Sequence, residues 1–279
     1  DNGADDYAIA VTVDGEGNIL VTGFRSPSAS EPEDMIIWRY NPDGSPDTTF
    51  GGTGYVTHDS AAGGSNKDGG LDILVDANGK ILVVGQSYTG SDMAMVLWRY
   101  NQDGSLDTTF DGNGYALYDT AGGDDLGEEL RIDANGKILV SGRSYNGTDL
   151  DMAVWRYNAD GSPDTGFGDS GCVRHNSAAG GSSEDRGRGL AIDAQGRILV
   201  SGRSDNGTDF DMAIWRFNPD GNLDTSFDDD NGYVIHHGAA GGNGEDVGFD
   251  TVLDGAGRIL VGGRSFNGVN FDMTIWRYR

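Results

Sequence analysis

Five aspartates recur at one fixed place in this chain, and carboxylates in such a set could bind a cation. Each lies eight residues before the Asp that ends a short apolar segment, although the residues around them differ; the five are Asp6, Asp68, Asp125, Asp185 and Asp246. Like charges brought together raise one another's pKa or recruit a counter-ion. A ring of these residues therefore predicts a cation site, which a divalent ion such as calcium could occupy. The sequence indicates no other cofactor. The favoured alternative is structural, with each Asp bonding loop amides or pairing with an Arg of the next repeat.

In a second recurring set, an Arg directly follows a Trp and is itself followed by an aromatic residue. A sugar or anion site could use such a trio, but strand alternation puts the Arg on the opposite face from the Trp. We therefore expect both residue types to be structural, with the Arg in an ion pair between neighbouring repeats. The tryptophans are Trp38, Trp98, Trp155, Trp215 and Trp276, the arginines are Arg39, Arg99, Arg156, Arg216 and Arg277, and the expected partners are Asp47, Asp107, Asp164 and Asp224.

A third set of acids precedes the Trp strand, and we favour a structural role in which each bonds loop amides. Its members are Asp34, Asp92, Asp151, Asp211 and Asp272. Asp92 lies two residues further from its Trp than the others do. This offset predicts a longer strand or a β-bulge in the second repeat.

Two further patterns argue against metal sites. In the Asn-x-Asp-Gly turn, Asn41 and Asp43 fit the third and fifth ligands of an EF-hand-like loop, but Arg39 would be the first. We therefore favour a plain Asx turn. His58, His175 and His236 occupy equivalent strands of different repeats, and His237 follows His236 in the same strand and should point to the opposite face, so no zinc site is expected. No Ser-His-Asp set, nucleotide loop or Cys cluster stands out, so we expect no enzyme.

The elements that carry these residues form a repeat. The tryptophans are 60, 57, 60 and 61 residues apart, a period typical of propellers or other repeat arrays. Each repeat contains an apolar strand, a tight turn closed by Gly, a strand such as KILVVG and the Trp strand. Four of the repeats add a short strand such as YVTH. The first two strands are near-continuous apolar runs, which predicts burial on both faces. Sheets stacked face to face in a ring provide that burial.

We therefore predict an all-β fold, a single five-bladed β-propeller over residues 1–279 with about 57–61 residues per blade. The short outer strand occurs only four times, so one blade should lack it. An open sheet edge of this kind can accept another strand, which suggests self-association. The sets of three inner strands lie near 6–41, 68–101, 125–158, 185–218 and 246–279.

Two segments carry a resemblance to a known family. The segment NPDGSPDTTFGGTGYV at 41–56, together with DANGKILVVGQS at 76–87, resembles the bacterial delta-60 repeat, and further copies cover essentially the whole chain. The resemblance implies a β-propeller-like, secreted or cell-surface, non-catalytic bacterial module. It transfers no active-site residue.

Composition narrows the partners. The net charge is −26, with 38 Asp against 7 Glu, so the surface should repel nucleic acid and anionic membranes. No apolar run approaches the ~20 residues of a membrane span, so no membrane insertion is expected. Our leading interpretation is a non-enzymatic extracellular scaffold or interaction module with a protein or glycan partner at the cell surface. One alternative is a lectin-like multivalent carbohydrate binder, and a second is a glycan-active hydrolase with carboxylates at the channel mouth.

Overall fold

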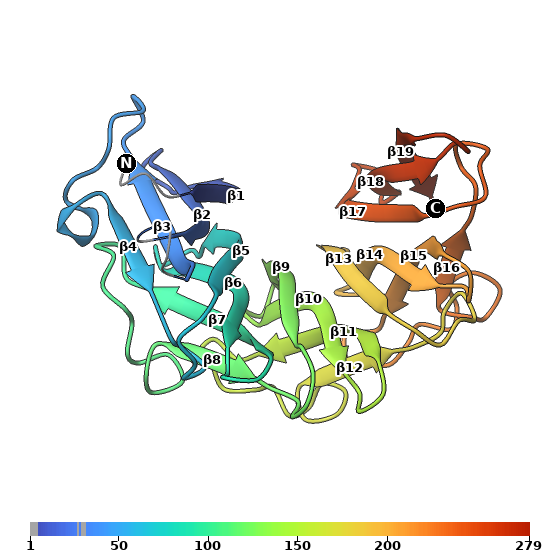
Figure 1. Cartoon of the computed structure of the whole chain (residues 1–279), viewed down its shortest axis with the longest axis horizontal. Helices are drawn as coiled ribbons and strands as arrows, with labels where there is room; N and C mark the ends of the chain where they lie inside the picture. Colours follow the sequence, from blue (N-terminus) through green and yellow to red (C-terminus); the bar gives the residue numbers. More distant parts are fainter. Residues whose placement is uncertain (1–4, 27, 29–31) are drawn as a thin grey trace. The chain divides into compact units, whose positions relative to one another are not determined.

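The computed structural model describes residues 5–26, 28 and 32–279, which fold into antiparallel β-sheets joined by turns (Figure 1). The described residues contain nineteen strands and one short 3₁₀ helix, η1 (Phe50–Gly52). The chain divides into two compact units, one comprising residues 1–130 and 159–162 and the other residues 131–158 and 163–279. That the whole chain forms one domain stays a prediction.

The strands form five sheets in chain order, each called a blade below. The first blade contains β1 (Asp6–Val13), β2 (Ile19–Arg25), β3 (Asp34–Tyr40) and β4 (Tyr55–His58), and the second contains β5 (Asp68–Val75), β6 (Ile81–Tyr88), β7 (Met93–Tyr100) and β8 (Tyr115–Tyr118). The third contains β9 (Leu126–Ile132), β10 (Ile138–Tyr145), β11 (Leu150–Tyr157) and β12 (Cys172–His175), and the fourth contains β13 (Asp185–Ile192), β14 (Ile198–Asp205), β15 (Phe210–Phe217) and β16 (Tyr233–His236). The fifth has only β17 (Asp246–Leu253), β18 (Ile259–Phe266) and β19 (Phe271–Tyr278). The prediction of an all-β propeller fold with five blades, one of them three-stranded, is confirmed.

The first hairpin of each blade closes as its sequence predicts. In the second blade, the Asp76 carboxylate accepts the backbone N–H groups of Asn78 and Lys80, both at 2.8 Å. Gly79 has φ = 75°, a left-handed conformation that Gly adopts without a Cβ clash. The hairpin therefore depends on the Asp that ends the first strand and on the Gly that ends the turn.

A β-bulge in the first strand of the blade explains the Gly that ends the K-I-L-V-x-G pattern. The β5–β6 register shifts between Gly70 and Asp72. A Cβ placed on Gly85 of β6 would lie 1.9 Å from the Gly69 carbonyl oxygen. Only Gly allows the two backbones to approach this closely.

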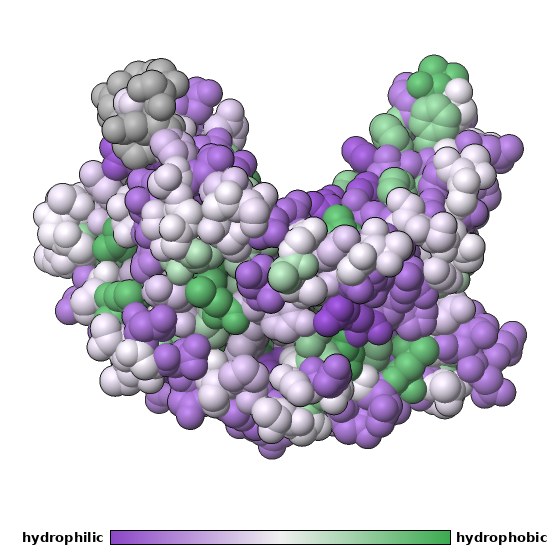
Figure 2. Space-filling view, turned by 60° about the horizontal axis from the view of Figure 1, so that its bottom comes forward, coloured by the Kyte–Doolittle hydropathy of each residue, from purple (hydrophilic) through white to green (hydrophobic). Residues whose placement is uncertain are grey.

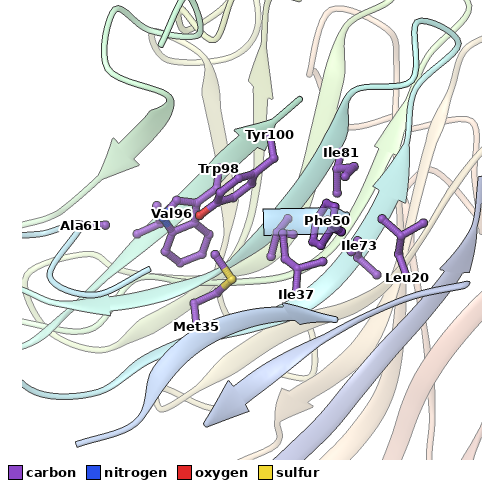
Figure 3. Packing of buried hydrophobic residues seen from close by; sticks show 11 residues of the cluster. Leu20, Met35, Ile37, Phe50, Ala61, Ile73, Ile81, Val96, Trp98 and Tyr100 are labelled. Atoms are coloured by element: carbon purple, nitrogen blue, oxygen red, sulfur yellow. The ribbon is translucent and has the colours of Figure 1, made fainter. Parts of the chain in front are cut away.

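The core of the first unit lies between its two blades. Strand β5 packs against β1, β2 and β3. Figure 3 shows how Met35 and Ile37 of β3 and Phe50 of η1 lie beside Trp98 and Ile81 of the second blade. Stacking of the sheets therefore buries much of β5, as its apolar run predicts, whereas the apolar strand β1 is largely exposed, contrary to the prediction.

The second unit stacks its blades in the same way. Strand β13 packs against β10 and β11, and β17 packs against β13, β14 and β15. One apolar cluster joins the third and fourth blades and another joins the fourth and fifth. Hydrophilic residues cover much of the face shown in Figure 2, as the charge of −26 implies. Among the described residues, no helix is long and apolar enough to cross a membrane.

Candidate functional site: clefts between neighbouring blades

In the first three blades, the arginine after the Trp joins its own blade to a turn of the next. Arg156 Nε donates to Asp164 at 2.9 Å, and the guanidinium stacks on Phe167 at 4.3 Å. Its Nη1 also donates to the carbonyl oxygen of Pro219, in the turn of the following blade. The ion pair expected between neighbouring repeats therefore lies within one repeat, and it is the bond to a backbone carbonyl that crosses to the next repeat. The same Arg–Asp pairing occurs at Arg39–Asp47, Arg99–Asp107 and Arg216–Asp224.

These aspartates are held ionised by their surroundings. Burial alone would raise the pKa of Asp164, but the hydrogen bond from Lys137 and the charge of Arg156 hold it below its usual value. Lys137 Nζ lies 3.1 Å from the Asp164 carboxylate, and Arg156 Nε lies 2.9 Å from it. Two cations therefore share one anion at this point of the third blade.

A cleft of about 670 Å³ opens beside this cluster, between the third and fourth blades. The first hairpin turns of both blades line it, together with the turn that holds Pro219. Its residues are Ile132, Asp133, Ala134, Asn135, Lys137, Arg156, Ile192, Asp193, Ala194, Gln195, Gly196 and Pro219. The cleft thus combines amides, carboxylates and cations with apolar side chains from two blades.

A cleft of about 230 Å³ occupies the equivalent place between the first and second blades. Asp14, Asp76 and Arg39 take the positions of Asp133, Asp193 and Arg156. Here the side chain of Gln102 reaches across to Glu16, with Nε2 and Oε1 3.5 Å apart. In the larger cleft these two positions are Pro219 and Asn135. The shorter side chains of Pro219 and Asn135 are the physical reason why the cleft between the third and fourth blades is larger.

Sequence reasoning missed the cleft residues Asn135, Gln195 and Pro219. The signal in the sequence was that the turn residues vary between strands that are nearly constant. The first hairpin turns read GEG, ANG, ANG, AQG and GAG between strands that hardly change. Turns that differ on a fixed scaffold are where proteins place binding residues.

The five aspartates proposed as a cation ring do not share one environment. Asp6 is partly exposed and lies 3.8 Å from Arg25. Asp68 and Asp185 are buried, and each accepts a backbone N–H from the preceding loop, from Ser60 and Ser177. Asp125 and Asp246 are buried in the same way and bond the N–H groups of Thr120 and Gly238. These are the bonds to loop amides that the structural alternative predicts. The cation ring stays a prediction.

Burial raises the pKa of both Asp68 and Asp185 to about 6, although hydrogen bonds from Ser87 and Ser204 act in the opposite direction. A folded-state pKa above the usual value makes the folded protein bind a proton more tightly than the unfolded chain does. The resulting stability is fully present below about pH 4 and is lost as the pH rises through about 6.

The acids before the Trp sit at the start of the Trp strand, except Asp92, which lies in the loop before β7. Asn146 and Asn206 donate to Asp151 and Asp211 at 2.8 and 2.9 Å. The bulge or longer strand expected near Asp92 is wrong, because β6 and β7 pair without a register shift.

The loop bonds explain the offset of Asp92. Its carbonyl oxygen accepts the N–H of Thr89, as the carbonyl of Asp149 accepts the N–H of Asn146. Asp92 is therefore the equivalent of Asp149, and Ala94 stands where the other blades have the later Asp.

The Asn-x-Asp-Gly turn closes on itself. The Asp43 carboxylate accepts the Ser45 N–H at 2.9 Å and the Ser45 hydroxyl at 2.6 Å. The Asn41 amide donates to the same hydroxyl at 3.0 Å. These are the bonds of an Asx turn.

Four stretches of the chain match a family model described as "Domain of unknown function (DUF5122) beta-propeller". The matched residues are 17–50, 77–110, 134–167 and 195–227. They fall on the second and third strands and the following turn of the first four blades. The chain is a tandem β-propeller repeat protein. No curated protein was found to match it.

Several solved structures resemble this repeat protein along nearly its whole length. An exo-1,5-α-L-arabinanase from a bovine ruminal metagenomic library is 12% identical, with 99% of this chain and 94% of that chain covered and a TM-score of 0.43. The α-L-arabinofuranosidase Arb93A from Fusarium graminearum is 12% identical, with 100% and 95% covered and a TM-score of 0.45. The polysaccharide lyase Uly1 is 11% identical, with 96% and 56% covered and a TM-score of 0.44.

These comparisons contradict the interpretation of the repeat protein as a non-enzymatic scaffold, because the similar structures are named as enzymes. The expectation that the chain is not an enzyme is contradicted on the same ground. At 11–12% identity the likeness concerns the fold alone. The function of this chain therefore depends on its own residues.

Proposed function

We propose that this protein is directed at glycans, and that it binds a neutral oligosaccharide in the cleft between its third and fourth blades. The observation that carries the proposal is the cleft of about 670 Å³, lined by polar and apolar residues of two blades. Its volume falls within the range of about 300–1,000 Å³ that ligand clefts occupy.

The lining suits the two surfaces of a sugar ring. Sugar hydroxyls both donate and accept hydrogen bonds, and the cleft offers the amide of Asn135 as well as the carboxylates of Asp133 and Asp193. The C–H face of a sugar is apolar, and Ile132 and Ile192 provide apolar contacts for it. This combination favours a saccharide over a purely apolar ligand.

The charges around the cleft favour a neutral sugar. Lys137 and Arg156 are both paired with Asp164, and Arg197 Nε is paired with Asp193 at 2.5 Å. Cations that already have carboxylate partners are weak attractors for a further anion. The strongly acidic protein as a whole also repels polyanions.

Hydrolysis of the bound glycan is the second candidate function, and one observation favours it. Asp133 and Asp193 come from different blades and line one cleft. Glycoside hydrolysis uses two carboxylic groups placed on either side of the scissile bond. An oligosaccharide held between these two residues would meet the residue types that the reaction requires.

A glycan array followed by titration calorimetry tests the binding proposal. We expect binding of neutral oligosaccharides that is abolished by excess free sugar, and weaker binding of uronic or sulfated oligosaccharides. Chromatography of the recovered sugars would reveal shorter products if the cleft also cleaves its ligand. Absence of saccharide binding across the array would overturn the proposal.

The small cleft provides the matched variants. The double variant Asn135→Glu with Pro219→Gln copies the residues that narrow the small cleft, and it should weaken binding by at least about tenfold because the side chains fill the space. The reciprocal variant Glu16→Asn with Gln102→Pro leaves the large cleft unchanged and should keep its affinity. Equal affinities for the two double variants would place the sugar elsewhere.

We also propose that these repeats belong with the delta-60 repeats of secreted and cell-surface bacterial proteins, and that the protein acts outside the cell. The long Asn-x-Asp-Gly-Ser-x-Asp-Thr-x-Phe pattern supports the assignment. An extracellular location would also bring the cleft into contact with polymeric glycans. Fractionation of the source cells, with detection by a specific antibody, tests the location.

A further inference from the structure

Two acids and a histidine come together at one end of the fourth blade. The ligand atoms of Asp209, Asp211 and His237 all lie within 4.8 Å of one another. His237 Nδ1 lies 2.7 Å from the Asp211 carboxylate. Within the described residues 5–26, 28 and 32–279, no other group of His, Cys, Asp or Glu meets this geometry.

The side chain of Asn206 fixes two of the three residues before any ion arrives. Asp209 and Asp211 occupy the loop and the start of β15, where the Asn206 amide donates to both carboxylates at 2.7 and 2.9 Å. The side-chain oxygen Oδ1 of Asn206 in turn accepts the backbone N–H groups of Thr208 and Asp209. The loop therefore holds both carboxylates in place.

His237 completes the group from another strand. It follows β16, whose last residue, His236, pairs with Met212 of β15. Its side chain is 44% exposed, whereas that of Asp211 is 9% exposed. An ion can thus reach the group from solvent and be held against a buried carboxylate.

The third blade shows what is special about the fourth. There Asn146 donates to Asp149 and Asp151 as Asn206 does to Asp209 and Asp211. The position of His237, however, is taken by Asn176. In the first two blades the residues at this position are Asp59 and Asp119. Among the blades with an outer strand, only the fourth adds an imidazole to the two carboxylates.

We propose that Asp209, Asp211 and His237 form a binding site for one divalent transition-metal ion of the zinc or manganese class. Two carboxylate oxygens and one imidazole nitrogen are a ligand set that such ions accept, with water completing the coordination. Calcium and magnesium prefer oxygen ligands alone, so the histidine selects against them. The site uses none of the residues that line the sugar cleft.

Titration calorimetry with zinc tests the site, using the full chain without a histidine tag, at pH 8 and with excess magnesium to occupy weak acidic sites. We expect one equivalent of zinc to bind. Cobalt in place of zinc should give visible absorption bands that change when the histidine ligand is removed. No binding of zinc above the background of the acidic surface would overturn the proposal.

The variant His237→Asn converts the fourth blade to the arrangement of the third. It should lose at least about tenfold in zinc affinity, because a direct ligand matters at least as much as the outer groups that cost 10–100-fold. Circular dichroism checks that the variant remains folded. Zinc affinity equal to that of the unchanged protein would contradict the assignment of His237 as a ligand.

A gain of binding in the third blade separates a built site from a general acidic surface. Asn176→His supplies the imidazole, and Arg174→Ile removes a cation whose charge acts on Asp151, since Ile235 stands at this place in the fourth blade. The double variant should bind two equivalents of zinc. A stoichiometry that stays at one would show that the three residues alone do not make the site.

Discussion

Strands β15 and β19 have almost the same sequence, FDMAIWRF and FDMTIWRY, but very different surroundings. In the fourth blade Met212 and Ile214 are fully buried. Their equivalents Met273 and Ile275 in the fifth blade are 79% and 67% exposed. The hydrophobic residues of the fifth blade are visible at the upper right of Figure 2.

Two neighbours make the difference. Met212 and Ile214 pack in one cluster with Val261 and Trp276 of the fifth blade. Strand β16 covers the edge of β15, whereas the described fifth sheet ends at β19. An apolar pattern along a strand therefore indicates that the strand belongs to a stacked blade. How far its side chains are buried depends on whether a neighbouring blade and an outer strand cover them.

Truncating the equivalent isoleucines should give the largest effect. Ile214→Ala removes a fully buried side chain and leaves a cavity, so it should lower the free energy of unfolding by about 2–5 kcal/mol. Ile275→Ala removes an exposed side chain and should stay within about 0.5 kcal/mol. Urea titration followed by tryptophan fluorescence measures both. Equal losses would mean that a further layer covers the fifth blade in solution.

The arginines of the two strands should give a smaller contrast. Arg216 is paired with Asp224 at 2.7 Å, and their side chains are 11% and 9% exposed. Arg216→Met would leave a buried carboxylate without its main cation and should cost about 2–3 kcal/mol, less than a fully buried pair because Arg197 lies 3.7 Å from the same carboxylate.

Arg277 provides the control for this substitution. It is exposed, whereas the side chain of Arg216 is only 11% exposed beside Asp224. Arg277→Met should therefore change the free energy of unfolding by less than about 0.5 kcal/mol. A loss at Arg277 as large as that at Arg216 would show that the Arg is needed for packing of its stem, not for its ion pair.

The fold was largely predictable because the same strand and turn pattern occurs in every repeat of the sequence. The Trp period, the Gly that ends each hairpin and the four copies of the outer strand together specify five sheets, one with three strands. The Asp partners of the arginines were also predictable, since strand alternation separates Arg156 from the face of Trp155. The expectation that these pairs join neighbouring blades was wrong, because Arg156 pairs with Asp164 of its own blade. The same logic failed at Asp92, because counting back from Trp98 does not show that Ala94 is the residue equivalent to Asp151.

The sites were not predictable, because they depend on side chains that break the repeat. The large cleft exists where Asn135 and Pro219 replace longer residues, a difference in size that no motif records. His237 was dismissed from the sequence because alternation in a strand turns it away from His236. It lies just beyond the end of β16, where alternation no longer applies and the loop turns it toward Asp211.

Amide exchange should show the smallest but most local difference between the two strands. The Arg216 N–H donates to the Gly232 carbonyl at 2.9 Å. Alternate N–H groups of a strand face the same edge, so that of Ile214 also points toward β16. The equivalent amides of Ile275 and Arg277 face the open edge of β19 and should exchange at least about 100-fold faster, since they lack a protecting partner. Hydrogen–deuterium exchange measured by NMR resolves these four amides.

A peptide with the sequence of residues 231–238, NGYVIHHG, sharpens the same measurement. In the fourth blade, β16 pairs with the residues of β15 from Met212 to Trp215. The equivalent residues of β19, from Met273 to Trp276, would pair with the peptide. Excess peptide should therefore slow exchange at Ile275 and leave Ile214 unchanged, because strand addition satisfies exposed backbone groups at a free edge. Self-association through this edge would produce the same protection as the protein concentration rises. Exchange at Ile275 that is already as slow as at Ile214 in dilute solution without peptide would show that the edge is covered from the start.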